Sequence, residues 1–148
     1  MTIDLDIQNA SEFEPVPRQE QFALWVEAAL QGKDDIELTL RLVDKSESRE
    51  LNARFRGKDQ PTNVLSFPAE LPPGIHIPLL GDIVICAPLV EEEAQAQDKH
   101  LQEHWAHLVI HGVLHLLGYD HQVEQDAIEM ERIEVELLAS LGIGNPYV

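Results

Sequence analysis

Residues 111–121 read HGVLHLLGYDH. His111 and His115 lie four positions apart in an apolar segment, and His121 follows beyond Gly118. On an α-helix, residues four apart differ by about 40° around the axis and about 6 Å along it, so the first two imidazoles project from one face. Gly118 can adopt the left-handed conformation that ends a helix and turns the chain, which would bring His121 back. The stretch therefore predicts a helix whose end gathers three imidazoles around one metal ion.

The spacing H-x-x-x-H-x-x-G-x-x-H coincides with the metal scaffold of the metzincin proteases at every ligand position and at the glycine. One position differs, because Gly112 stands where those proteases carry the glutamate that serves as general base. Three neutral nitrogen ligands leave one vertex of a tetrahedral ion open, which is typical of catalytic rather than structural sites. The pattern therefore predicts a zincin-like site that suits hydrolysis but lacks the usual base for peptide hydrolysis.

Three more histidines, His100, His104 and His107, precede the motif on the same helical stripe as His111. A single histidine on an apolar helix is usually a core residue, so we expect these three to pack or hydrogen-bond beneath the site. Asp120 leaves two interpretations open. Its carboxylate would either orient an imidazole from behind or cap the following helix.

The apolar patterning of the remaining chain predicts an α+β fold, a small mixed sheet of about four strands packed with about five helices, in one domain over residues 1–148. Alternating or short apolar runs predict strands at 2–8, 35–43, 63–68 and 81–86. Helical periodicity and breakers predict helices at 18–31, 45–56, 88–99, 100–117 and 126–142. In the second of these helices, we expect Ser46 to act as the N-cap and Leu51 and Phe55 to form the apolar stripe.

Composition limits the function classes. The 148 residues are 44% hydrophobic, enough for a sizeable core. Residues 1–10 contain no uninterrupted apolar run, and no apolar segment is long enough to cross a bilayer, so we expect a cytoplasmic protein without a membrane role. The single cysteine, Cys86, lies between apolar neighbours and is expected to be buried and inert.

The net charge is −17, which disfavours loose attraction to phosphate polymers. Residues 41–58 are the exception, because they include six basic and three acidic residues. Their net charge is +3, whereas that of the remaining chain is −20. Two interpretations stay open for this basic segment. It is either a solvated helix face with pairs such as Glu50–Arg54 or a local patch that binds phosphate.

Four blocks of the sequence together resemble the YbeY family of metal-dependent endoribonucleases. They are HGVLHLLGYDH (111–121), FRGKDQPTNVLSFP (55–68), LLGDIVIC (79–86) and EHWAHLVI (103–110). The resemblance runs over essentially the whole chain. It implies one Zn²⁺ ion bound by His111, His115 and His121, and it places the family's essential arginine at Arg56. The family also lacks the protease glutamate, so Gly112 fits it.

The resemblance further implies a single-strand-specific endoribonuclease that acts in ribosomal RNA processing, notably 3′-end maturation of the small-subunit RNA, and in ribosome quality control. The strongly acidic chain favours delivery to ribosomal RNA and the small subunit by a ribosomal or assembly protein. Two rival functions remain. One is a non-catalytic ribosome assembly factor in which zinc only pins the last helices together, and the other is a metalloprotease.

Overall fold

The computed structural model describes residues 3–33, 35–75, 77–119 and 124–147. In chain order, the elements are β1 (Ile3–Asn9), α1 (Gln19–Leu30), β2 (Ile36–Val43), α2 (Lys45–Arg56), β3 (Val64–Pro68), β4 (Leu79–Cys86), α3 (Ala87–Ala96), α4 (Leu101–Leu116) and α5 (Glu124–Ser140). The predicted α+β class, with its mixed sheet and its numbers of strands and helices, is confirmed within these ranges.

The strands form one sheet in the order β1-β2-β4-β3. β1, β2 and β4 run parallel, and β3 pairs antiparallel with β4 at the edge. Ile83, Val84, Ile85 and Cys86 of β4 are all buried, because this central strand has helices on both faces. The expectation of a buried Cys86 is confirmed.

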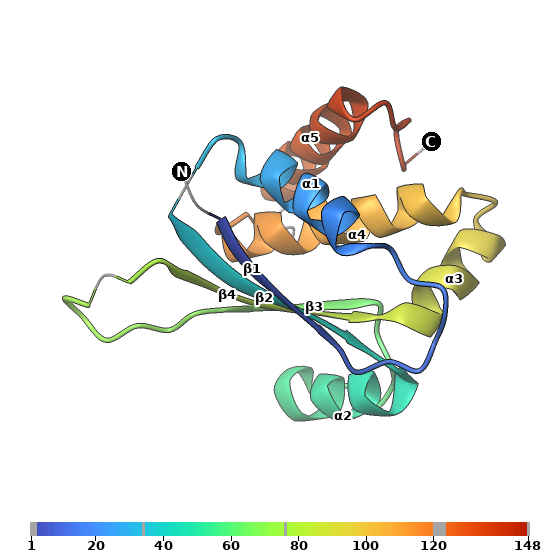
Figure 1. Ribbon diagram of the computed structural model, residues 1–148, viewed down its shortest axis with the longest axis horizontal. Coiled ribbons are helices and arrows are strands. Elements are labelled where there is room, and N and C mark those ends of the chain that lie inside the picture. The colour runs from blue at the N-terminus through green and yellow to red at the C-terminus, as the bar shows by residue number, and fades with distance from the viewer. Residues whose placement is uncertain (1–2, 34, 76, 120–123, 148) are drawn as a thin grey trace.

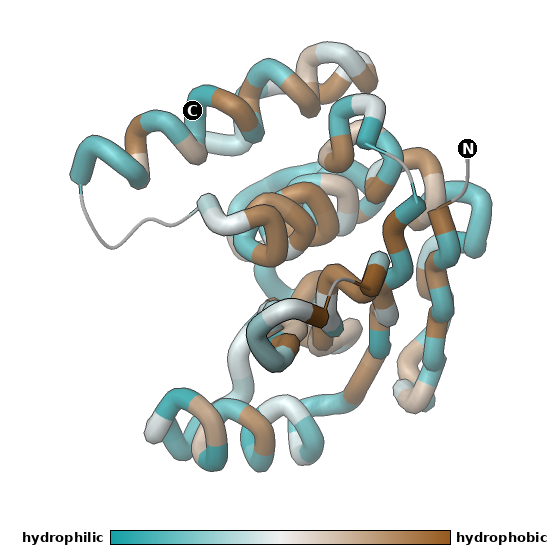
Figure 2. The backbone as a smooth tube through the Cα atoms, turned by 90° about the vertical axis from the view of Figure 1, so that its left-hand side faces the viewer, coloured by the Kyte–Doolittle hydropathy of each residue, from teal (hydrophilic) through white to brown (hydrophobic). Residues whose placement is uncertain are grey.

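The helices form unequal layers around the sheet (Figure 1). α1 and α4 cover one face, α2 covers the other, and α5 lies on the far side of α4 from the sheet. Helix α4 contacts α1, α3, α5, β3 and β4. The hydropathy of the helices agrees with this arrangement. Figure 2 shows that α4, in the centre, is largely hydrophobic, whereas α2 is largely hydrophilic. The central helix that carries the histidine motif is therefore held by packing on several sides.

Three predicted elements have wrong bounds, and one predicted cap is wrong. The helix expected at 126–142 spans Glu124–Ser140. β4 begins at Leu79 rather than at residue 81, because Leu79 pairs with Glu37 across an irregularity in the ladder. The helix expected at 88–99 spans Ala87–Ala96, and a positive φ at Asp98 separates it from α4. Ser46 lies inside α2, and the extended residue at the N-cap is Asp44.

Candidate metal centre and active site

His111 and His115 bring their ring nitrogens together on one face of α4. Their Nε2 atoms lie 3.1 Å apart, and the two ring planes are inclined at 77°. The four-residue spacing produces this geometry, because α4 remains regular through both positions. The structure thus places two of the three predicted ligands side by side. The third, His121, and its neighbour Asp120 lie outside the described residues.

Glu134 of α5 lies behind His111. Its side chain is fully buried, and its two oxygens lie 2.7 Å from His111 Nδ1 and 2.8 Å from His107 Nε2. The Tyr147 hydroxyl also donates a hydrogen bond to Glu134. This carboxylate therefore joins α4, α5 and the C-terminal segment at one point.

Electrostatics fixes the proton positions in this group. Burial alone would raise the pKa of Glu134, but the hydrogen bonds from His107, His111 and Tyr147 lower it to about 2. The carboxylate is ionised at neutral pH and only accepts, so Nδ1 of His111 carries the proton. The other ring nitrogen of His111, Nε2, lies towards His115. Burial and the charge of Glu134 raise the pKa of Tyr147, so its phenol stays protonated.

The donor set could hold a metal ion. His107, His111 and Glu134 each offer one ligand atom, and these atoms lie within 4.8 Å of one another. The Nε2 atoms of His111 and His115 form a second, overlapping arrangement. Nitrogen ligands about 2.0–2.1 Å from a tetrahedral zinc ion lie about 3.3 Å apart, close to the separation of this histidine pair. The residues present therefore fit a zinc ion chemically.

Of the three histidines expected to pack or hydrogen-bond beneath the site, His104 and His107 do so, whereas His100 does not. His104 is buried and its Nε2 lies 2.8 Å from Glu93 of α3. Asn63, just before β3, donates its side-chain amide to the same carboxylate. Burial raises the pKa of Glu93, but the hydrogen bonds from His104 and Asn63 bring it below its ordinary value. His100 lies exposed at the N-cap of α4.

Arg56 lies at the last position of α2, and its exposed guanidinium reaches the edge strand β3. Nη2 donates to the carbonyl of Ser66 at 3.0 Å, and Nη1 donates to the carbonyl of Phe55 at 3.2 Å. The Ser66 hydroxyl in turn donates to the carbonyl of Gly112, next to His111, at 3.0 Å. Two hydrogen bonds thus connect Arg56 to the turn of α4 that carries His111.

Gly112 faces the sheet at close range. A Cβ atom at this position would lie 3.0 Å from Cγ2 of Ile83 and 3.4 Å from Oγ of Ser66. A larger side chain therefore requires the side chains of Ile83 and Ser66 to shift. The absence of the protease glutamate has a packing reason in this chain.

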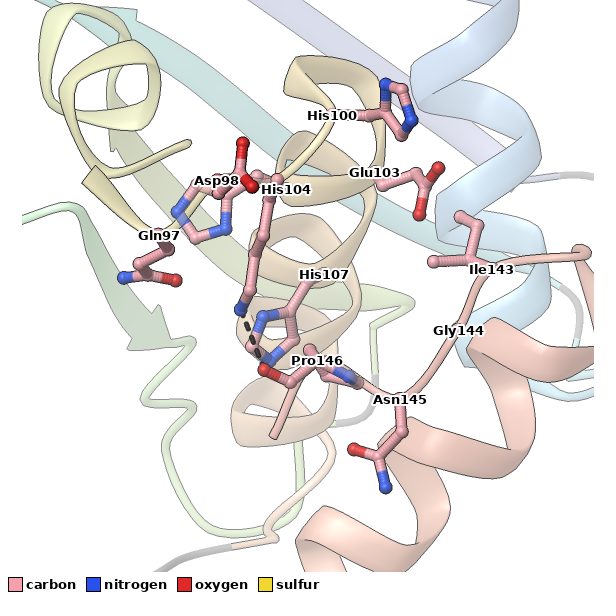
Figure 3. Close-up of a pocket in the computed structure, with 11 residues that line it drawn as sticks. Gln97, Asp98, His100, Glu103, His104, His107, Ile143, Gly144, Asn145 and Pro146 are labelled. Carbon is pink, nitrogen blue, oxygen red and sulfur yellow. Dashed lines mark hydrogen bonds between the residues drawn. The ribbon is translucent and has the colours of Figure 1, made fainter. Parts of the chain in front are cut away.

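A cavity of about 220 Å³ lies between the α3–α4 turn, α4 and the C-terminal segment. His104 and His107 line it, and Lys99 donates to the carbonyl of Pro146 at 2.7 Å across it, as the dashed line in Figure 3 shows. Its lining includes neither His115 nor Arg56. It lies against the histidines that support the site and does not hold the paired Nε2 atoms.

The roles of Glu134 and Tyr147 beside the histidines were not predicted from the sequence. The signal for Glu134 was present, because a charged residue stands in the apolar stripe of α5 beside Ile133 and four residues after Met130. An acidic residue at a core position must have a polar partner. Tyr147 carries no comparable local signal, since its contact with Glu134 joins the C-terminal segment to α5.

No helix in the described ranges combines the length and apolarity required to span a bilayer.

Two comparisons with known proteins identify the family of the chain. The family profile described as Endoribonuclease YbeY matches residues 6–142. The fold is similar to the solution structure of TM1509 from Thermotoga maritima, with a TM-score of 0.57 and 25% sequence identity over 95% of this chain and 92% of that chain. The chain therefore belongs to the YbeY family of endoribonucleases, RNA-cleaving hydrolases that act in ribosomal RNA processing.

Proposed function

We propose that the chain is a zinc-dependent, single-strand-specific endoribonuclease that matures the 3′ end of small-subunit ribosomal RNA and acts in ribosome quality control. The observation that carries the proposal is the pair of Nε2 atoms of His111 and His115, 3.1 Å apart on a helix. Family membership supports RNA as the substrate. Residues 1–148 would act as one domain.

In this proposal, His111, His115 and His121 bind one Zn²⁺ ion. Glu134 and His107 orient rather than ligate, because their contacts of 2.7 and 2.8 Å are hydrogen-bond lengths and shorter than the roughly 3.3 Å between two ligands of a tetrahedral zinc. A metal-binding histidine commonly donates its other ring N–H to a carboxylate, which fixes its tautomer and orientation. When bound, zinc supplies Lewis acidity towards a phosphodiester.

Arg56 is the proposed catalytic residue. A guanidinium can clamp a phosphate through two parallel hydrogen bonds and stabilise the charge that develops on it. Two backbone carbonyls already hold the Arg56 side chain at the edge of β3, so little rotamer freedom remains to be lost on binding. Its connection through Ser66 to Gly112 supports a position near the histidine pair.

The expected partners are ribosomal RNA and the small ribosomal subunit in the cytoplasm. A net charge of −17 opposes unaided binding to RNA. We therefore propose that a ribosomal or assembly protein delivers the enzyme to its substrate.

The decisive experiment combines metal analysis with RNA cleavage. Protein purified without metal-affinity steps is expected to contain about one zinc per chain and to cleave single-stranded RNA but not the matching duplex. His115→Ala is expected to lose both zinc and cleavage, whereas the control His100→Ala changes an exposed histidine on the same helix and is expected to keep both. The proposal fails if zinc is absent from the protein and reconstitution restores no cleavage.

Two further measurements test the alternative function as an assembly factor and identify the nucleophile of the reaction. A folded His115→Ala variant that still supports 3′-end processing would favour the non-catalytic assembly factor. End-group analysis of the cleaved RNA identifies the nucleophile. A 2′,3′-cyclic phosphate implicates the 2′-hydroxyl of the substrate, and a 5′-phosphate implicates water.

A further inference from the structure

Two rings and two guanidinium groups cluster where α2 ends beside β3. The rings of Phe55 and Phe67 meet edge-to-face with centroids 5.2 Å apart. The guanidinium carbon of Arg54 lies 5.3 Å from the centroid of Phe55, and that of Arg56 lies 5.2 Å from the centroid of Phe67. All three separations are within the range of aromatic and cation–π contacts. We name these four residues the Arg–Phe cluster.

Phe55 is more exposed than a core residue. Phe55 was predicted to lie on the apolar stripe of α2, but 50% of its surface is open to solvent. Phe67 does pack against the small apolar core under α2, which contains Val43, Leu65 and Val84. Phe55 contacts Phe67 edge-to-face and leaves half of its own surface open to another planar group.

The charges around the cluster divide into two sets. Residues 41–58 contain six basic side chains, and three of them are paired with carboxylates. The pairs are Arg41–Glu47, Lys45–Glu92 and Arg49–Asp59. The other three, which lie at or just after the end of α2, have no carboxylate partner within 4.0 Å among the described residues. They are Arg54, Arg56 and Lys58. Within residues 41–58, the positive charge that no carboxylate pairs with thus lies at or beside the Arg–Phe cluster, in a chain that is otherwise strongly acidic.

An exposed ring beside cations that no carboxylate pairs with suits one chemical class of ligand. Single-stranded nucleic acid presents flat bases, which stack on aromatic rings and guanidinium planes, and phosphates, which attract Arg and Lys. A purely apolar protein partner would not require the cations, and a free phosphate would not require the rings. Arg56 also links the cluster through Ser66 to the turn of α4 that carries His111.

We propose that the Arg–Phe cluster is a stacking subsite for one unpaired base of single-stranded RNA, next to the phosphate held at the catalytic centre. The inference rests on the proposed function and deepens it, because it gives a physical reason for single-strand specificity. A base paired within a duplex has no free face to stack on Phe55, so only an unpaired base gains this contact.

The test measures binding of a fluorescent single-stranded 2′-O-methyl oligonucleotide, checked by gel to remain intact during the titration. Phe55→Ala is expected to weaken binding about tenfold, the order expected for the loss of one stacked base. For a strand of equal length with abasic residues, parent and Phe55→Ala are expected to bind equally. Leu24→Ala is the matched control, since Leu24 is 53% exposed and lies on α1; it is expected to bind both strands as the parent does.

Phe55→Trp supplies a second, direct readout. The native Trp25 and Trp105 are buried, with exposed fractions of 5% and 1%, so the new indole is the exposed one. Its fluorescence is expected to fall when the base-containing strand binds and to remain unchanged with the abasic strand. Retained affinity in this variant also separates loss of the ring from loss of fold.

The outcomes distinguish the two proposals. If the parent cleaves single-stranded RNA but Phe55→Ala binds the base-containing strand equally well, the stacking subsite is wrong and the endoribonuclease stands; Phe55 would then be available as an apolar contact for a protein. If folded, zinc-loaded parent neither binds nor cleaves single-stranded RNA, both proposals are wrong.

Discussion

The Nδ1 atom of His111 donates a hydrogen bond of 2.7 Å to the buried carboxylate of Glu134, across the contact between α4 and α5. This bond orients the imidazole of His111 so that its Nε2 lies 3.1 Å from Nε2 of His115. A metal-binding histidine commonly donates its other ring N–H to a carboxylate, and Glu134 would have this role if His111 binds the proposed zinc ion.

Replacing the carboxylate by an amide tests that role. Glu134→Gln is expected to weaken zinc binding about 10- to 100-fold, because a neutral amide stabilises the ligating tautomer of His111 less well. Competition with a chromogenic chelator measures the affinity. The exposed Glu129→Gln, on the same helix, is the control and is expected to bind zinc as the parent does. Equal affinity in Glu134→Gln would leave Glu134 with a packing role alone.

Arg56→Ala is expected to reduce RNA cleavage about 10²- to 10³-fold, the typical cost of removing one donor that stabilises the transition state. Zinc content is expected to be unchanged, because Arg56 contacts the carbonyls of Ser66 and Phe55 and no predicted ligand. Arg56→Lys is expected to recover only part of the activity, since an ammonium group lacks the planar fork. Arg132→Ala removes an exposed arginine on α5 and is expected to cleave at the parent rate. A parent-like Arg56→Ala would make this side chain a surface charge only.

Gly112→Glu is expected to lower the free energy of unfolding by about 1–3 kcal/mol, the usual cost of overpacking, because its Cβ would lie 3.0 Å from Ile83 Cγ2. It is also expected to gain no casein cleavage, although it restores the metzincin pattern. Urea denaturation and a casein assay with added zinc measure the two effects. Gly144→Glu is the control, since no atom lies within 4 Å of a Cβ built there. Casein cleavage by Gly112→Glu would revive the protease interpretation.

Acid is expected to weaken the contact between the N-terminal segment and α2. The hydroxyl of Ser11 and the backbone N–H of Glu12 both donate to Asp44 and hold its pKa below the ordinary 3.8. Because the folded-state pKa is the lower one, the contribution to stability is full above the unfolded-state pKa and is lost as the pH falls through the folded-state value. Below about pH 4, the unfolding free energy of the parent is thus expected to fall more steeply than that of Asp44→Asn. Asp4→Asn, at an exposed position, is the control and is expected to follow the parent curve; identical curves for all three proteins would contradict the prediction.

Zinc is expected to stabilise the fold by mass action, since a ligand that binds only the native state at 100 times its Kd adds about 2.7 kcal/mol. Thermal unfolding with and without a chelator measures this shift in the parent. In His115→Ala the chelator is expected to leave the Tm unchanged, and a Tm shift as large as that of the parent would place the ion elsewhere.

The parts of this protein that follow local rules could be predicted from the sequence. Helical spacing predicted the convergence of His111 and His115, and alternation of apolar residues predicted the strands, because both depend on the geometry of a single element. Ser46 was wrongly placed as a cap since its hydroxyl is a good cap in isolation, whereas the extended backbone before the helix falls at Asp44.

The remaining features depend on contacts between distant segments. Glu134 bonds across two helices, and Phe55 meets Phe67 only because α2 ends beside the edge strand. Neither contact has a fixed sequence spacing. Helical periodicity correctly predicts that α2 is a helix. It does not predict that Phe55, on the apolar stripe of this helix, is half exposed.

The central place of α4 also determines how the protein would lose its chemistry. A helix in contact with three other helices and two strands unfolds only when most of the molecule does, so its amides should be among the slowest to exchange with deuterated solvent. Histidines on this helix should therefore keep their relative spacing until the fold as a whole unfolds.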